Sequence, residues 1–209
     1  MRMVFDPEFD HGSWPGPLRG RRASAGEDWV GPSGLLAVLE TALGIGGPPL
    51  TTQERAARLV PAILRTDGFW SASSEVDPFS TARRLLQWRD TLVMGGWAGT
   101  ARGPRLAALA ALPAADLPGL PDRLRLVQRA LERRASAIER IELFTPRADL
   151  EWLWQGTLDL LERRGTRITG QDLGTAPAPA GSDLAVARAG RFKPQGDGSL
   201  ILLRPAGPL

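Results

Sequence analysis

A chain of 209 residues with 43% hydrophobic and 23% charged residues can bury a proper core, and its composition is that of a globular domain rather than a disordered segment. The absence of cysteine excludes disulfides, thiolate nucleophiles and cysteine-ligated metals, and no apolar run is long enough for a membrane span or a secretory signal, which predicts a cytoplasmic protein. The net charge of +3 at pH 7 permits contact with nucleic acid without requiring it.

The first forty or so residues predict a strand, a loop and a helix. Residues 2–6 are apolar and β-prone, as in a short strand. The segment 10–31 is rich in Gly, Pro and Trp and shows no periodicity, so we expect a long irregular loop. A helix is expected to begin at Pro32, because leucines then recur on one helical face until Gly44.

Four further helices are predicted in the middle of the chain. A capping box over Thr51–Glu54 begins the first, which Pro61 is expected to kink or shorten. The segment Asp77–Gly96 has a capping aspartate, a proline at the first helical position and glycines at its end. A shorter helix covers about 105–112, and an amphipathic one opens at Pro121.

The last third of the chain predicts strands again. Residues 141–144 form a short apolar strand, after which Thr145 is expected to cap a long helix with Trp154 on its inner face. Another strand is expected at 167–170 and a fully apolar one at 199–204. Strands separated by helical stretches indicate an α/β protein with a small, mostly parallel sheet and packed helices.

The domain organisation follows from these elements. Residues 1–173 are expected to form the α/β domain, with a helical insertion at about 50–135. The Ala-, Pro- and Gly-rich segment 174–198 is expected to be a linker or surface loop. Because a buried parallel strand normally leads into a crossover helix, the apolar strand in 199–209 is expected to be a truncated continuation of the fold, or to be covered by something else.

Gly31, Ser33 and Gly34 occupy the place of a phosphate-binding loop, between a loop and the start of a helix. A true nucleotide-hydrolysing loop needs a lysine for the phosphate charge and a neighbouring hydroxyl for Mg²⁺, and both are missing here. The segment is therefore an ordinary helix start or, in the alternative interpretation, a vestigial or anion-binding loop. We expect no nucleotide cofactor.

No other pattern forms a complete catalytic site. His11 is the only histidine, so a two-histidine metal site is excluded, and a Ser-His-Asp triad is not indicated because Ser13, Ser24 and Ser33 lack the context of a nucleophile elbow. We expect His11 to be a surface loop residue. Metal-dependent nucleases of the PD-(D/E)XK type need an acid two positions before a lysine, and the only lysine, Lys193, has Arg191 there. A noncanonical carboxylate site would have to use loop acids such as Glu27, Asp28 or Asp67, and we expect neither a metal nor an enzyme.

Arginines are concentrated on two predicted helices. A solvated helix face is the simpler explanation, and contact with DNA phosphates is the alternative. All but one of the 26 basic residues of this chain are arginines. Such an excess of arginine over lysine is also typical of proteins from GC-rich genomes. The candidates for nucleic-acid binding are Arg83, Arg84, Arg123, Arg125, Arg129 and Arg133.

The chain has seven tryptophans and no tyrosine. Trp154 fits a core stripe, whereas Trp152 projects from the opposite face of the same helix, and Trp14 and Trp29 are expected in loops. These last three could stack on bases or anchor a partner, although packing within a long loop explains them as well.

Several segments together resemble the amino-terminal region of AddB-like proteins, in which an inactivated superfamily I helicase body precedes a PD-(D/E)XK nuclease. The similar stretches are Val30–Gly44, Asp77–Pro78 with Leu85–Leu92 and Gly96–Trp97, Leu120–Leu124, and Gly198–Arg204. Their order and spacing are similar to the family over roughly 30–204.

The resemblance implies a degenerate first helicase lobe whose ATP site has been lost and whose nuclease motifs lie further downstream. No catalytic residue of the family can be transferred to this chain. The expected function is a non-catalytic scaffold that contacts DNA backbone weakly and docks onto the remaining lobes or a partner helicase or nuclease subunit. The alternative is a stand-alone protein-interaction subunit that uses the strand at 200–203 and does not bind DNA.

Overall fold

A computed structural model describes residues 1–11, 26–114, 116–170, 182–183 and 186. Contacts group the chain into a first unit, Met1–Gln171, and a second, Asp172–Leu209. In the second unit the Val186 N–H donates to the Ser182 carbonyl at 3.0 Å, as in one helical turn. The rest of the predicted linker at 174–198 and the predicted strand at 199–204 lie outside the described residues.

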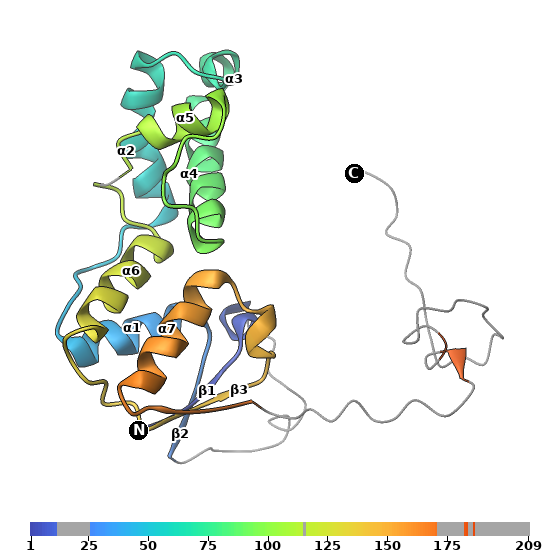
Figure 1. The fold of residues 1–209 in the computed structure, drawn as a ribbon. Coiled ribbons are helices and arrows are strands. Elements are labelled where there is room, and N and C mark those ends of the chain that lie inside the picture. Colours follow the sequence, from blue (N-terminus) through green and yellow to red (C-terminus); the bar gives the residue numbers. More distant parts are fainter. Residues whose placement is uncertain (12–25, 115, 171–181, 184–185, 187–209) are drawn as a thin grey trace. The chain divides into compact units, whose positions relative to one another are not determined.

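A four-stranded, all-parallel sheet forms the base of the first unit (Figure 1). Its strands are β1 (Arg2–Phe5), β2 (Glu27–Val30), β3 (Arg140–Leu143) and β4 (Arg167–Gly170), in the order β2-β1-β3-β4. This confirms the expected α/β class with a small parallel sheet and packed helices, and three of the strands lie within one residue of their expected bounds.

The prediction of an irregular loop through residue 31 was wrong at β2. The strand has the sequence Glu-Asp-Trp-Val and lies at one end of the described sheet, where it pairs with β1 alone. A short, half-exposed strand with two acids has neither the apolar run nor the alternation by which strands are identified. A 3₁₀ helix, η1 (Pro7–His11), also falls partly in the predicted loop.

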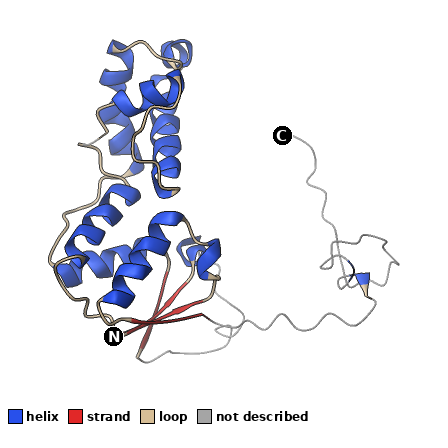
Figure 2. Cartoon of the chain, in the orientation of Figure 1, coloured by secondary structure: helices blue, strands red, loops and turns tan. Residues whose placement is uncertain are grey.

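The two faces of the sheet differ. Met3 and Phe5 of β1 point to one face and pair in register with Ile141 and Leu143 of β3, which point the same way. Helices α1 (Pro32–Leu43), α6 (Leu120–Leu131) and α7 (Trp152–Arg163) supply most of the rest of this core, and Val93 and Met94 join it from a further helix. In Figure 2 these helices lie on one side of the strands.

The opposite face carries a small aromatic cluster. Val4 of β1 packs there with Phe9, Trp29 and Phe144. The Trp29 ring lies 5.2 Å from that of Phe144 and 5.5 Å from that of Phe9, between centroids. Trp29 was expected in a loop but lies on β2, and its ring packs locally against this cluster.

A second core belongs to a helical insertion of four helices, α2 (Thr52–Arg65), α3 (Ser71–Val76), α4 (Pro78–Met94) and α5 (Pro104–Ala111). Leu59 and Ile63 of α2 meet Leu85 and Leu86 of α4 at its centre. The predicted insertion also included α6, but the leucines of α6 pack into the core on the sheet. The separate bundle is thus α2 to α5.

Pro61 does not end its helix. Helix α2 continues to Arg65, because both Pro61 and Ala57, whose carbonyl loses its usual partner at position i+4, are exposed to water. The capping box at its start is present: the Glu54 N–H donates to Thr51 Oγ1 at 3.1 Å, and the Thr51 N–H donates to Glu54 Oε2 at 2.8 Å.

Thr145 does not cap the helix that follows it. A short 3₁₀ helix, η3 (Arg147–Asp149), comes first, and α7 begins only at Trp152. The Thr145 hydroxyl instead donates to Asp6 Oδ2 at 2.9 Å, and this partner could not be deduced from the local sequence. Trp154 is fully buried and Trp152 is 60% exposed, as their places in the helix predicted.

Among the described residues, no helix combines the length and the apolar character that a bilayer span needs.

Candidate nucleic-acid interface

The strand order defines where a ligand would be expected. The connection after β1 leads to β2 on one side, whereas β3 is followed by β4 on the other side, so the order reverses between β1 and β3. In open α/β sheets, ligands bind outside the carboxyl ends of the strands at such a point. Asp6 follows β1 and Thr145 follows β3, and here these two side chains bind each other.

A cleft of about 1000 Å³ lies above this edge, between the sheet and the helical insertion. The 3₁₀ helix η1 and the start of α7 contribute carboxylates, whereas the opposite side contributes two arginines of α4 and the ion pair between Arg55 and Asp90. A polyanion in the cleft would therefore meet repulsion from one wall, and the attractive surface is the α4 rim. The charged lining residues are Glu8, Asp10 and Glu151 on the first wall, with Arg83, Arg84, Arg55 and Asp90 on the second.

The phosphate-loop position is occupied by a carboxylate of the chain itself. Asp10 Oδ2 accepts a hydrogen bond from the Ser33 N–H at 2.8 Å, at the start of α1. Gly31, the N-cap, lies directly against the Asp10 side chain and backbone. The helix N-terminus thus has its anion already, and Gly31, Ser33 and Gly34 present no vacant phosphate cradle.

Substituting Gly31 with alanine is expected to destabilise the protein by about 1–3 kcal/mol, the usual effect of overpacking. A Cβ there would lie 2.5 Å from the Asp10 backbone nitrogen and would collide with the Asp10 carboxylate. Gly47→Ala is the matched control, because its Cβ would meet nothing within 4 Å. Equal urea-unfolding midpoints for the two variants would contradict the close approach of Asp10.

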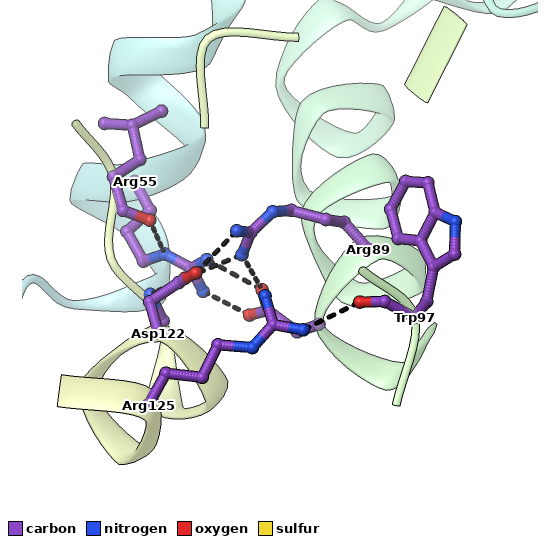
Figure 3. A network of polar contacts seen from close by, with 8 residues as sticks. Arg55, Arg89, Trp97, Asp122 and Arg125 are labelled. Atoms are coloured by element: carbon purple, nitrogen blue, oxygen red, sulfur yellow. Dashed lines mark hydrogen bonds and ion pairs between the residues drawn. The ribbon is translucent and has the colours of Figure 1, made fainter. Parts of the chain in front are cut away.

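The inner side of α4 is occupied by a network of ion pairs that joins α2, α4 and α6 (Figure 3). Arg55 of α2 donates to Asp90 Oδ2 at 2.6 Å and to the Leu117 carbonyl at 3.0 Å. Arg89 donates to both oxygens of Asp122, at 2.6 and 2.5 Å, and to Asp90 at 3.1 Å.

The network fixes the charge of its central arginine. Burial lowers the pKa of Arg89, but the hydrogen bonds and charges of Asp122 and Asp90 outweigh burial and raise the pKa above its usual value. Asp122 also accepts from the Gly119 N–H at 2.9 Å, which caps α6. Arg89 is consequently a structural cation that is not available to a ligand.

The structure divides the six candidate arginines into two groups. Arg123 is held by Glu40 of α1, with contacts of 2.8 and 2.5 Å. Arg125 donates to the Trp97 carbonyl at 2.8 Å (Figure 3). Both guanidinium groups are therefore engaged in holding α6 in place. The exposed group comprises Arg83 and Arg84 on α4, and Arg129 and Arg133 at the end of α6 and just beyond it.

An aromatic pair beside the exposed arginines of α4 was missed in the sequence. Trp88 of α4 is 47% exposed and Phe69, in the turn before α3, is 39% exposed. Their rings are stacked, with centroids 6.2 Å apart and planes inclined by 26°. The guanidinium of Arg105 lies 5.9 Å from the Phe69 centroid. The available signal was the spacing of Arg84 and Trp88, four positions apart on the polar side of a helix.

The loop acids considered for a noncanonical site are not gathered. Glu27 is paired with Arg2 at 2.8 Å, Asp28 is exposed on β2, and Asp67 is exposed between α2 and α3. In the described ranges, no three His, Asp or Glu side chains lie together as metal ligands would. Trp14 lies outside the described residues.

No protein-family model matches the chain, and no curated protein matches its sequence. The functional interpretation therefore depends on the arrangement of side chains, above all on the exposed face of α4.

Proposed function

We propose that this chain is a non-catalytic scaffold that contacts DNA backbone, as part of or beside a DNA end-processing or repair protein of the helicase–nuclease type. It contacts DNA through the exposed arginines and docks onto further lobes or a partner subunit. The DNA-repair setting comes from the AddB-like resemblance of the sequence.

The observation that carries the DNA proposal is the state of Arg83 and Arg84. Both side chains are exposed on the α4 rim, and neither has an ion-pair partner within 4 Å among the described residues. Arg84 donates a hydrogen bond to Gln87 at 3.3 Å. The charge of Arg83 interacts with Asp77, but it is not held in a direct ion pair, so both arginines can contact phosphates without breaking an ion pair of the fold.

The non-catalytic character is supported by Asp10. Its carboxylate accepts the Ser33 amide at the start of α1, so a nucleotide phosphate at this position would have to displace an internal charge of the same sign. The sequence of this loop also lacks the lysine on which phosphoryl-transfer loops depend.

Salt-dependent DNA binding tests this proposal. Fluorescence anisotropy of a labelled single strand and of a blunt duplex is measured over a salt series. For single strands, the double variant Arg83→Ala/Arg84→Ala is expected to bind more weakly and to reduce the slope of log K against log salt by about 1.4, or about 0.7 per lost phosphate contact.

The matched control removes two exposed arginines from elsewhere, Arg163→Ala/Arg167→Ala, and is expected to leave the slope nearly unchanged. Binding by the wild-type chain that does not depend on salt, or no binding to either DNA, would rule out the proposal. The alternative of a protein-interaction subunit would then come first. The strand at 200–203 on which that alternative depends lies outside the described residues.

A further inference from the structure

We propose that Trp88 and Phe69 form a stacking platform for the bases of single-stranded DNA, with Arg84 and Arg105 contacting the adjacent phosphates. This inference rests on the proposed function, since it assigns a substrate class, the single strand, to the DNA-contacting face of α4.

The two rings are arranged as a platform rather than as part of a core. Their planes are 26° from parallel and they stack on each other, yet Trp88 keeps 47% and Phe69 keeps 39% of its surface exposed. Exposed aromatic rings lose hydrophobic stabilisation unless something covers them. A flat, nearly parallel pair presents ring faces that a planar, apolar group can cover.

The platform is held firmly from below. Trp70 is 3% exposed, and its indole N–H donates to the Ile63 carbonyl at 3.3 Å. Phe69 packs edge-on against Trp70 with centroids 5.0 Å apart. Gly68 N–H donates to Ser71 Oγ at 2.9 Å, which closes the turn. A preorganised turn of this kind loses little conformational entropy when a ligand binds.

The charges beside the rings favour a nucleic-acid strand over an apolar protein segment. Arg84 lies one helical turn before Trp88 on the same side of α4, and Arg105 lies over the Phe69 ring. Two arginines thus flank the stacked rings, and a single strand offers bases to rings and phosphates to guanidinium groups. A duplex does not fit as well, because its bases are already stacked and present only their edges.

The test compares the wild-type chain and Trp88→Ala for binding of a labelled oligothymidylate and of an abasic strand of the same length and charge. The wild-type chain is expected to bind the intact strand more tightly than the abasic one. Trp88→Ala is expected to lose roughly 5- to 150-fold in affinity for the intact strand, the range for one stacked base. It should bind the abasic strand as the wild-type chain does.

Two further variants separate stacking from other causes. Trp88→Phe keeps an aromatic face and should retain most of the affinity. Trp152→Ala removes a tryptophan that is 60% exposed on α7, away from the platform, and should bind as the wild-type chain does. Circular dichroism and the thermal midpoint of each variant establish that it is folded.

The outcomes distinguish the platform from the proposed function. Equal binding of intact and abasic strands by the wild-type chain overturns the platform but leaves the arginine contacts standing, and it would reassign the exposed pair to a protein partner. Equal losses for Trp88→Ala and Trp152→Ala also overturn the platform. Absence of all DNA binding overturns both proposals.

Discussion

Replacing Asp90 with alanine is expected to destabilise the first unit by about 3–5 kcal/mol, the usual effect of removing one partner from a buried ion pair. Asp90 accepts from both Arg55 and Arg89, and the Arg55 side chain is only 8% exposed. Without the carboxylate, Arg55 loses its ion-pair partner while it has little access to water, and Arg89 is left with Asp122. The loss is measured as the free energy of unfolding in urea.

Two control variants test whether the loss of stability in Asp90→Ala comes from the buried ion pair. Asp159→Ala also removes a carboxylate that pairs with an arginine, but Asp159 is 62% exposed, so the loss should be below about 1 kcal/mol. The double variant Arg55→Met/Asp90→Leu removes both charges and should be more stable than Asp90→Ala alone. If Asp90→Ala were no worse than Asp159→Ala, the network would have no structural role.

Replacing Trp154 with alanine is expected to cost about 3–5 kcal/mol, because the side chain is fully buried in the core on the sheet. Its ring lies 5.2 Å from that of Phe5, between centroids. The indole nitrogen has no hydrogen-bond partner in the described part of the chain, so Trp154→Phe keeps the aromatic contact and removes an unsatisfied donor.

Thermal and urea unfolding check the ranking of these variants. Trp154→Phe should cost much less than Trp154→Ala, and Trp152→Ala, at the exposed position two residues earlier, should stay within about 0.5 kcal/mol of the wild-type chain. A Trp154→Phe variant as unstable as the alanine variant would indicate that the indole N–H has a partner.

Local signals in the sequence were sufficient for most of the helices. The Thr51 capping box, the Asp77 cap and the glycines at 44 and 95 determine helix ends through contacts within a few residues, and such contacts can be read from spacing. The short strand β2 and the role of Thr145 depend on partners far along the chain. Spacing carries no information about those partners.

The candidate interface was predictable only in part for the same reason. Arg123 and Arg83 look alike in the sequence, yet Arg123 is held by Glu40, a residue far along the chain, whereas Arg83 is exposed on α4. Likewise Trp88 of α4 stacks on Phe69, which lies in the turn between α2 and α3. Charge and helical phase identify the exposed candidates, whereas tertiary pairing decides which of them remain available.

The pairing of β1 with β3 has a consequence for the order of folding. Met3 lies beside Ile141 in the sheet, although the whole helical insertion separates the two residues along the sequence. Contacts between residues so distant in sequence form late, because closing the long intervening segment costs conformational entropy before the contacts can stabilise the chain. During synthesis β1 and β2 therefore leave the ribosome long before β3 exists. The α2–α5 bundle, built from nearby helices with its own core, can assemble first and bring the two strands within reach.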